Sequence, residues 1–526
     1  MVRILSTENK RYVKEQTVLA ARWSAVGIVI LGLLGFALLS WKGEIVEREN
    51  PSPAEWSYVT RSSWRSAWLS QLEDLARMAQ INWGNAGQHW RKCLLRLEDK
   101  EIDGKDLLDI SPQGASAYQE VRGIGPVAFD ASAKSEAWKA GYAEVVMKTA
   151  LAAEHLQEMV VDYRQSAFFP KSTVVGPSNP KPRSVPGGGT PPQEADTGPA
   201  MPDPAVLYNR VAHGIGFSPR QRIDAMHAHA NWLEFNKNTE GADEQYQYAV
   251  SVARSALPSD PVLSNTTEIA AIPNTVSVLD NRPETATSNL INTLSTQAAY
   301  MSRTSRTSEA LPIFLSALRA VRHAASHPTP TSVSGSITQS TPSGPFAQWS
   351  AQYFRPDEFP LPLRTGDEPL SSLDPAALKC KEAELMTYIG EILFSTSSSR
   401  RKDGLAWTKR AADEAEKTLR SLMRISNSVP GDGAVQERER ERKTGMNRKE
   451  REACRECLVM GVRNWELMAS RMLESGHVKE QKKGWKSWFG REEDVQPEGD
   501  ELEAAQRLKQ DLIGEGLVQP WAFLRR

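Results

Sequence analysis

Residues 226–258, with the sequence MHAHANWLEFNKNTEGADEQYQYAVSVARSALP, carry the pattern that decides the fold of this chain. Ala242, Tyr246 and Ala249 follow the spacing A-x3-Y-x2-A, and Ala230 stands twelve residues before Ala242. Small residues at these positions let two helices cross closely, and an aromatic side chain fills the gap beside them. The stretch therefore predicts a pair of packed helices joined by a short turn.

A second stretch repeats the spacing. Residues 294–322 have the sequence LSTQAAYMSRTSRTSEALPIFLSALRAVR. The matching positions are Ala298, Ala310, Phe314 and Ala317. In both stretches apolar residues flank the upstream alanine at the same offsets. This spacing is typical of a tetratricopeptide repeat (TPR), and it favours an array of such pairs over the alternative, an ordinary helical bundle with alanine-rich contacts.

The rest of the chain is predicted to be helical between proline-rich breaks. Apolar residues recur at three- and four-residue steps, as at Trp64, Trp68 and Leu72. Alternating β-branched runs are missing, apart from short pieces such as Thr275 to Leu279. Weaker copies of the repeat spacing are Ala86/Trp90/Cys93 and Gly404/Thr408/Ala411, the latter after Ile389-Gly390. We predict an all-α protein with a single N-terminal transmembrane helix, followed by a degenerate TPR-like array of helical hairpins with proline-rich insertions.

Breaks in composition divide the chain into segments. Proline and glycine gather where neither helix nor sheet interior is expected. The predicted order is a short basic N-terminal segment (1–22), a transmembrane helix (23–41), a helical region (42–167), a Pro/Gly-rich linker (168–204), a TPR-like helical region (205–325), a Pro/Ser/Thr-rich linker (326–375) and a helical region with TPR-like pairs (376–526).

The predicted membrane anchor is the run WSAVGIVILGLLGFALLSW at residues 23–41, which has no formal charge and ends in Trp23 and Trp41. At about 1.5 Å per helical residue it spans roughly 28 Å, close to the ~30 Å hydrocarbon core of a bilayer. Tryptophan at each end suits the two interfaces. A cleaved signal peptide is the alternative, but the following Lys42-Gly43-Glu44 makes a poor cleavage site.

Basic residues indicate the orientation of the anchor. More of them precede the apolar run than follow it directly: Arg3, Lys10, Arg11, Lys14 and Arg22 come before, and Lys42, Arg48 and Arg61 come after. By the positive-inside rule the N-terminus lies in the cytosol or the mitochondrial matrix, with the body on the other side. Glu8 and Glu15 make the leader a poor mitochondrial transit peptide.

The sequence contains few motifs that are typical of catalysis, metal binding or nucleic-acid binding. With 64 basic and 65 acidic residues, the net charge of −1 gives no basic field for nucleic acid. Phosphate-loop, HExxH and GxSxG motifs are missing from the sequence, so we expect no catalytic residue, no cofactor and no metal site. Cys454 and Cys457 form a CxxC without further close ligands, and four cysteines are too few for a disulfide framework. His227 and His229 point to different faces of a helix, and His229 takes a packing position.

Two charged segments lie near the C-terminus. Residues 482–490, KKGWKSWFG, combine aromatic rings with positive charge in Lys482, Lys483, Trp485, Lys486, Trp488 and Phe489. They are a candidate contact with a partner protein or anionic lipid, or else a helix end that packs its tryptophans into the last pair. The charged run at 436–452 has nearly cancelling signs, which favours a solvated helix face over an RNA contact.

The 15 tryptophans are unevenly placed. Those crowded just after the anchor are Trp56, Trp64, Trp68, Trp83 and Trp90. Some are expected to fill contacts between helices. An exposed remainder would suit a groove for apolar peptide, because large aromatic side chains carry much of the energy at binding surfaces.

A single anchor, the phrase ENPSPAEWSYVTRSSWRSAW at residues 49–68 and helical pairs broken by proline-rich insertions occur together in this chain. In this architecture the chain resembles the fungal mitochondrial inner-membrane proteins that act as substrate-adaptor subunits of the i-AAA protease. The resemblance implies an N-terminus in the matrix, a body in the intermembrane space and no catalytic residues. It also implies that the body presents unfolded or unassembled membrane proteins to the protease.

The expected function is therefore that of a membrane-anchored protein-binding adaptor of the inner membrane, and not of an enzyme. The expected partners are the AAA protease complex, misfolded substrate proteins and the membrane, with no nucleic acid. One alternative is a TPR chaperone or import receptor of the mitochondrial outer membrane, although the lysine and asparagine clamp of such receptors is missing. The others are a non-catalytic scaffold subunit of a membrane complex and a membrane-tethered enzyme with an unfamiliar site. For location, the outer membrane and the ER are the alternatives.

Overall fold

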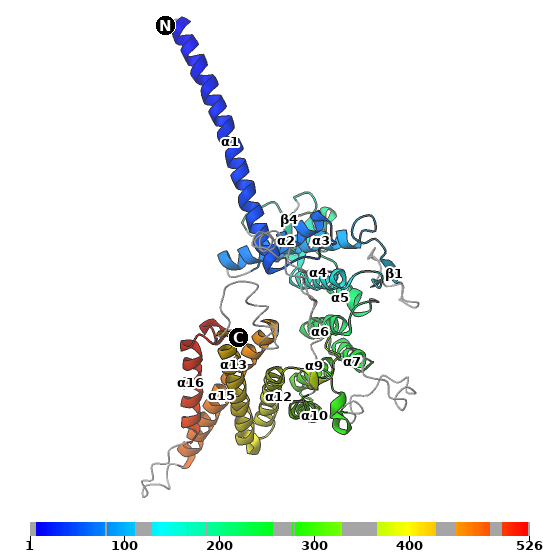
Figure 1. Ribbon diagram of the computed structural model, residues 1–526, viewed down its shortest axis with the longest axis vertical. Coiled ribbons are helices and arrows are strands. Elements are labelled where there is room, and N and C mark those ends of the chain that lie inside the picture. The colour runs from blue at the N-terminus through cyan, green and yellow to red at the C-terminus, as the bar shows by residue number, and fades with distance from the viewer. Residues whose placement is uncertain are drawn as a thin grey trace, which may run out of the picture. The chain divides into compact units, whose positions relative to one another are not determined.

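The computed structural model describes residues 7–78, 81–110, 128–165, 167–185, 187–255, 276, 279–328, 365–427, 448–483 and 497–523. Within these ranges the chain is mostly helical (Figure 1). The described residues form two compact units, with the boundary between Phe217 and Ser218.

The first unit begins with α1 (Thr7–Glu49), whose C-terminal end packs on α2 (Tyr58–Met78). The remaining helices of the unit follow in order, each packed on the one before it: α3 (Trp83–Glu98), α4 (Glu136–His155) and α5 (Pro204–Ala212). Because α5 packs on α4, the start of the region predicted at 205–325 belongs to the first unit.

The first unit also contains two small antiparallel sheets. In one, β1 (Leu108–Ile110) pairs with β2 (Ala128–Asp130); in the other, β3 (Met159–Asp162) lies between β4 (Ala167–Pro170) and β5 (Thr197–Pro199). The all-α prediction is wrong for these strands, and residues 168–204 supply two of them rather than only a linker. The strands are too short to show alternation in the sequence. Pro170 and Pro199 end edge strands, where a missing N–H is tolerated.

The second unit consists of helices that pack on one another in sequence order (Figure 1). They are α6 (Pro219–Phe235), α7 (Thr239–Ser255), α9 (Ser288–Arg303), α10 (Thr307–Ser326), α12 (Pro375–Thr396), α13 (Arg401–Asn427), α15 (Arg448–Lys483) and α16 (Pro497–Gly514). Val276 and Leu279, from a piece whose sequence looked strand-like, are helical.

Each helix of the second unit packs on the next one along the chain, and the first helices of successive pairs also contact one another. Helix α6 packs on α9, α9 on α12, and α12 on α15. Two of the second helices are also joined by an ion pair, in which Lys409 of α13 lies 2.9 Å from Glu501 of α16. Stacks of helical pairs curve because each pair is slightly rotated on the one before it.

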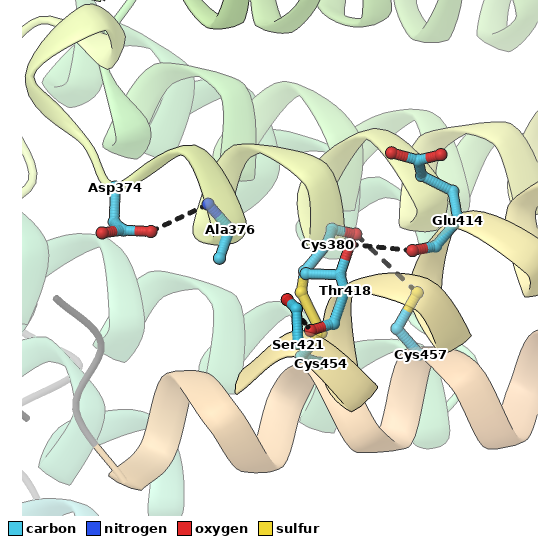
Figure 2. Close-up of a disulfide and its surroundings, with 8 residues drawn as sticks. All are labelled: Asp374, Ala376, Cys380, Glu414, Thr418, Ser421, Cys454 and Cys457. Carbon is cyan, nitrogen blue, oxygen red and sulfur yellow. Dashed lines mark hydrogen bonds between the residues drawn. A yellow bond between two sulfur atoms is a disulfide. The ribbon is translucent and has the colours of Figure 1, made fainter. Parts of the chain in front are cut away.

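Local sequence explains where two of these helices begin. The Ser218 hydroxyl accepts a hydrogen bond from the N–H of Gln221, and the Gln221 side chain accepts one from the N–H of Ser218, which makes a capping box for α6. A carboxylate oxygen of Asp374 accepts a hydrogen bond of 2.8 Å from the N–H of Ala376 at the start of α12 (Figure 2). A proline at the first helical position follows each cap.

Candidate functional site

The packing positions predicted from the repeat spacing are all fully buried. They are Ala230, Ala242, Tyr246 and Ala249 in the α6–α7 pair, and Ala298, Ala310, Phe314 and Ala317 in the α9–α10 pair, each with 0% of its surface exposed. Ala230, Ala242 and Tyr246 share one apolar cluster, which Tyr300 of α9 joins. Alanine at these sites places two helices close together, and the aromatic ring fills the space beside them.

The turns of the two pairs have the same backbone geometry. Lys237 and Ser305 have positive φ angles of 62° and 65°. In each turn the N–H of the next residue donates to the carbonyl oxygen of a residue in the last helical turn, Asn238 to Leu233 and Arg306 to Met301. This is the Schellman arrangement that ends a helix. Both turns occupy the same register relative to the buried alanines, and the offset between the pairs is about twice the 34-residue period of a TPR.

Polar side chains join the first pair to the second. The Arg303 guanidinium donates to both carboxylate oxygens of Glu234, at 2.8 and 2.9 Å, and these hydrogen bonds lower the pKa of Glu234. The Tyr300 hydroxyl donates to the Thr239 carbonyl oxygen at 2.9 Å. These contacts fix the register of one pair on the next.

The α12–α13 pair has glycine where the first two pairs have alanine. A Cβ atom on Gly390 would lie 2.9 Å from the carbonyl oxygen of Gly404, and one on Gly404 would lie 2.7 Å from that of Gly390. Thr408 is fully buried and Ala411 is 1% exposed. The weaker copy of the spacing therefore marks an even closer approach of two helices than the alanine copies do.

Most of the tryptophans after the anchor form core rather than binding surface. Trp56, Trp64 and Trp90 are 3% exposed or less, and Trp68 is half-buried. The Trp64 ring centroid lies 5.6, 6.2 and 5.3 Å from those of Trp56, Trp68 and Trp90, all in edge-to-face contacts. These rings fill the contact between α2 and α3, which confirms the expectation that some of the tryptophans serve helix packing.

Trp83 is the exception, since it lies at the edge of an open pocket of about 570 Å³. Its ring stacks on His155, with 4.4 Å between centroids, and Met159 and Phe168 line the same pocket. Partial burial lowers the pKa of His155. In the first unit the weaker copy of the repeat spacing consists of Ala86, Trp90 and Cys93, and all three side chains are fully buried.

The first helices of the second unit carry a polar and aromatic strip that we call the inner strip, made of Arg303, Glu384, Tyr388, Glu391 and Asn464. Tyr388 is half-buried, and the charges of the two glutamates and of Arg303 act on its hydroxyl. The Glu391 carboxylate accepts a hydrogen bond from the Asn464 amide across α12 and α15. Burial raises the pKa of Glu391. Sequence reasoning missed this strip because these residues come together only through the order of helix packing.

The apolar segment of α1 is exposed where the structure describes its side chains. The segment Arg11–Gly35 of α1 has a mean hydropathy of 1.9 and is 0% buried, so it is long and apolar enough to cross a membrane, as a single-pass anchor or as a signal sequence. Trp23 and Trp41 are each 69% exposed. The helix does not end at Trp41 but continues without a break to Glu49.

The last turn of α1 belongs to the core of the first unit. Val46 is 2% exposed, and the buried Glu47 carboxylate accepts a hydrogen bond of 2.8 Å from Arg61 of α2. Glu47 also accepts from the N–H of Ser52 at 3.1 Å and lies 3.5 Å from Arg65. One continuous helix therefore connects the apolar segment to the folded body.

Cys380 of α12 and Cys454 of α15 form a disulfide (Figure 2), with Cα atoms 5.3 Å apart and a separation of 74 positions in sequence. Sequence analysis found the CxxC but not this distant partner of Cys454. Cys457 is a thiol whose sulfur lies 3.9 Å from the Cys380 carbonyl oxygen, and burial raises its pKa to about 12. Within the part of the chain that the structure describes, no three potential metal ligands come together.

The two histidines of α6 have different surroundings. His229 is 5% exposed and takes the predicted packing position. The His227 ring lies 6.0 Å from that of Tyr246, and its Nε2 atom is buried without a hydrogen-bond partner among the described residues. Burial lowers the pKa of His227 to about 4.

Some predicted residues fall outside the described residues. Lys482 and Lys483 end α15, but their side chains are not among those described. Also outside are Trp485, Lys486, Trp488 and Phe489, together with most of the charged run at 436–452. The candidate lipid or partner contact therefore stays a prediction.

Comparisons of the chain with protein-family models, with curated proteins and with solved structures found no match. Functional inference therefore depends on the geometry of the chain itself.

Proposed function

We propose that this chain is a membrane-anchored, TPR-like adaptor that binds unfolded or unassembled membrane proteins and recruits them to an AAA protease of the mitochondrial inner membrane. The N-terminus lies in the matrix and the body in the intermembrane space. The protein is not an enzyme; it supplies a binding surface and a position. The observation that carries this proposal is the recurrence of one helical-pair geometry in the second unit.

The recurrence supports a repeat array. The α6–α7 and α9–α10 pairs share buried small residues, a buried aromatic ring and a left-handed turn residue in one register. Each pair alone leaves an apolar face uncovered, and stacking with its neighbour buries it. Such arrays bind extended segments of other proteins along the inner face of the curve.

The inner strip is the proposed substrate contact. The ring of Tyr388 stands among Glu384 and Glu391, and the side chain of Glu384 is 37% exposed. An aromatic ring flanked by carboxylates suits an extended segment that carries both apolar and basic side chains.

The anchor sets where this surface works. Because α1 runs without a break from its apolar segment into the core of the first unit, the first unit stays beside the bilayer that holds the substrates. Glu47 and its partners make this junction stiff, since a helix end held by buried ion pairs has little freedom to swing.

The test measures the half-life of an unassembled inner-membrane protein in cells that carry wild-type chain, no chain or a variant. We expect loss of the chain to lengthen the half-life several-fold. Glu384→Lys should have the same effect and should reduce crosslinking to the substrate. Glu503→Lys on α16 is the matched control, because it makes the same charge change at a surface ion pair with an exposed carboxylate.

Two outcomes would oppose the proposal. An unchanged half-life without the chain would exclude adaptor function. If the chain nonetheless copurified with the protease, that result would favour a scaffold subunit instead.

A further inference from the structure

The disulfide lies in an apolar setting between three helices. Cys380 is 8% and Cys454 1% exposed, and they form one buried cluster with Leu422 of α13, against which Ala376 and Ala377 pack. The Cα separation of 5.3 Å is within the normal range for a disulfide. The fold of the second unit therefore places these two sulfur atoms for a bond without rearrangement.

We propose that the Cys380–Cys454 disulfide is formed in the cell, and that the second unit therefore folds in an oxidising compartment. Disulfides persist in such compartments, while thiol reductants of the cytosol keep cysteines reduced. This inference adds to the proposed function, because it states on which side of the membrane the body works. It rests on the proposed function only for which membrane that is.

Two separate features of the chain indicate that the body lies on the oxidising side of the membrane. The basic residues before the apolar run place the N-terminus on the reducing side of the membrane. The disulfide is formed by residues more than 300 positions away and places the body on the opposite side. A chain with its body in the cytosol would satisfy neither feature.

The bond forms by thiol–disulfide exchange with a protein oxidant that carries a disulfide. One chain thiolate attacks that disulfide and forms a mixed disulfide, which releases one thiol of the oxidant. The second chain thiolate then displaces the other, so the chain loses two protons and two electrons and the oxidant leaves as a dithiol. Because both cysteines are buried in the folded unit, this exchange precedes the final packing of α12 on α15.

Cys457 can be compared with Cys454, because both lie near Cys380 on the same helix face. It lies one helical turn after Cys454, beside the same partner, yet it is a thiol. In the folded unit its sulfur lies 3.9 Å from the Cys380 carbonyl oxygen, while the Cys380 sulfur is bonded to Cys454. The bonded pair is therefore specific to Cys454.

The test uses the full-length chain in isolated organelles. Acid precipitation stops thiol exchange, the protein is dissolved in denaturant at neutral pH with N-ethylmaleimide to block every free thiol, and it is then digested with trypsin without reduction. We expect the dipeptide Cys380-Lys381 to be linked to residues 452–455 (EACR), and residues 456–463 (ECLVMGVR) to carry the maleimide. Maleimide on both Cys380 and Cys454 would overturn the inference, and so would a link from Cys380 to the peptide that contains Cys457.

Two variants and the degradation assay separate this inference from the proposed function. Cys454→Ser should abolish the linked peptide, whereas Cys457→Ser should retain it. If both cysteines are alkylated while substrate turnover still depends on the chain, the compartment inference fails and the adaptor proposal stands. If the linked peptide is present and turnover is unaffected by loss of the chain, the reverse holds.

Discussion

Gly390 of α12 and Gly404 of α13 pack backbone to backbone, so that a Cβ atom on either would lie within 3 Å of the other's carbonyl oxygen. Real Cβ atoms essentially never come that close to another atom, so the helices would have to separate. Thr408, fully buried in the same contact, leaves no room for such a shift. This contact gives the most stringent test of the helical-pair geometry.

Gly404→Ala should lower the free energy of unfolding of the second unit by about 1–3 kcal/mol, because the added methyl group overpacks against backbone atoms. Gly461→Ala is the control, since its Cβ would meet Ala412 at an ordinary 3.6 Å. That variant should be neutral or stabilising by about 0.5–1 kcal/mol, as expected for glycine in a helix interior. Urea denaturation followed by circular dichroism measures both, and equal effects would contradict the packing described.

Ala310→Leu should destabilise the second unit by about 1–3 kcal/mol, because Ala310 has no exposed surface and its site cannot take a larger side chain. Ala453→Leu makes the same change at an exposed position of α15 and should shift stability by less than about 0.5 kcal/mol. The midpoints of thermal unfolding give the comparison. A tolerated Ala310→Leu would show that the predicted packing positions are not packed.

Glu47→Gln should destabilise the first unit by about 3–5 kcal/mol, because it leaves the cluster of Arg61 and Arg65 without its buried carboxylate. Glu44→Gln provides the control, since Glu44 forms an exposed pair with Arg48 at 3.2 Å that is worth less than about 1 kcal/mol. Resistance of the detergent-solubilised chain to limited proteolysis measures the difference. Identical digestion rates would mean that α1 is not joined rigidly to the body.

The second unit should lose stability as the pH falls below about 6.5. The pKa of His227 is about 4 in the folded chain, because burial disfavours its charged form, and about 6.5 when unfolded. The unfolded state therefore binds one proton more in this window, and up to about 3 kcal/mol of stability is lost as the pH approaches 4. Denaturation curves between pH 7 and pH 4 should show a slope that His227→Gln removes. A slope shared by both proteins would assign it to other groups.

Reduction of Cys380–Cys454 should lower the stability of the second unit. The chain-entropy model gives about 4 kcal/mol for a bond that closes a loop of 74 residues. Thermal unfolding with and without reductant should therefore differ for wild-type and Cys457→Ser protein, and not for Cys454→Ser. A reductant effect that survives in Cys454→Ser would place the bond elsewhere.

The sequence predicted the parts of the fold that depend on local periodicity and spacing. Ala230, Tyr246 and their counterparts could be placed because small and aromatic residues recur at fixed steps along two adjacent helices. The strands around β3 could not, because each is only three or four residues long and the edge strands end in proline. Alternation needs a longer run to be recognised.

The candidate site was less accessible to sequence reasoning. The Cys380–Cys454 bond and the inner strip join residues from helices far apart in the chain, and no local pattern encodes that proximity. The sequence indicated that some tryptophans after the anchor fill helix contacts, but it could not show which ones do so, as the edge-to-face cluster around Trp64 does. The exposed fraction of each tryptophan side chain, which only the structure gives, distinguishes a ring in the core from a ring on a binding surface.

The central claim is tested most directly by protease protection of a C-terminal tag in intact mitochondria, in swollen mitoplasts and in detergent. The account predicts that the tag is protected in intact mitochondria and digested once the outer membrane is ruptured, which places the body in the intermembrane space. Digestion of the tag in intact mitochondria would contradict the account and favour an outer-membrane receptor, and absence of the chain from mitochondria would contradict both.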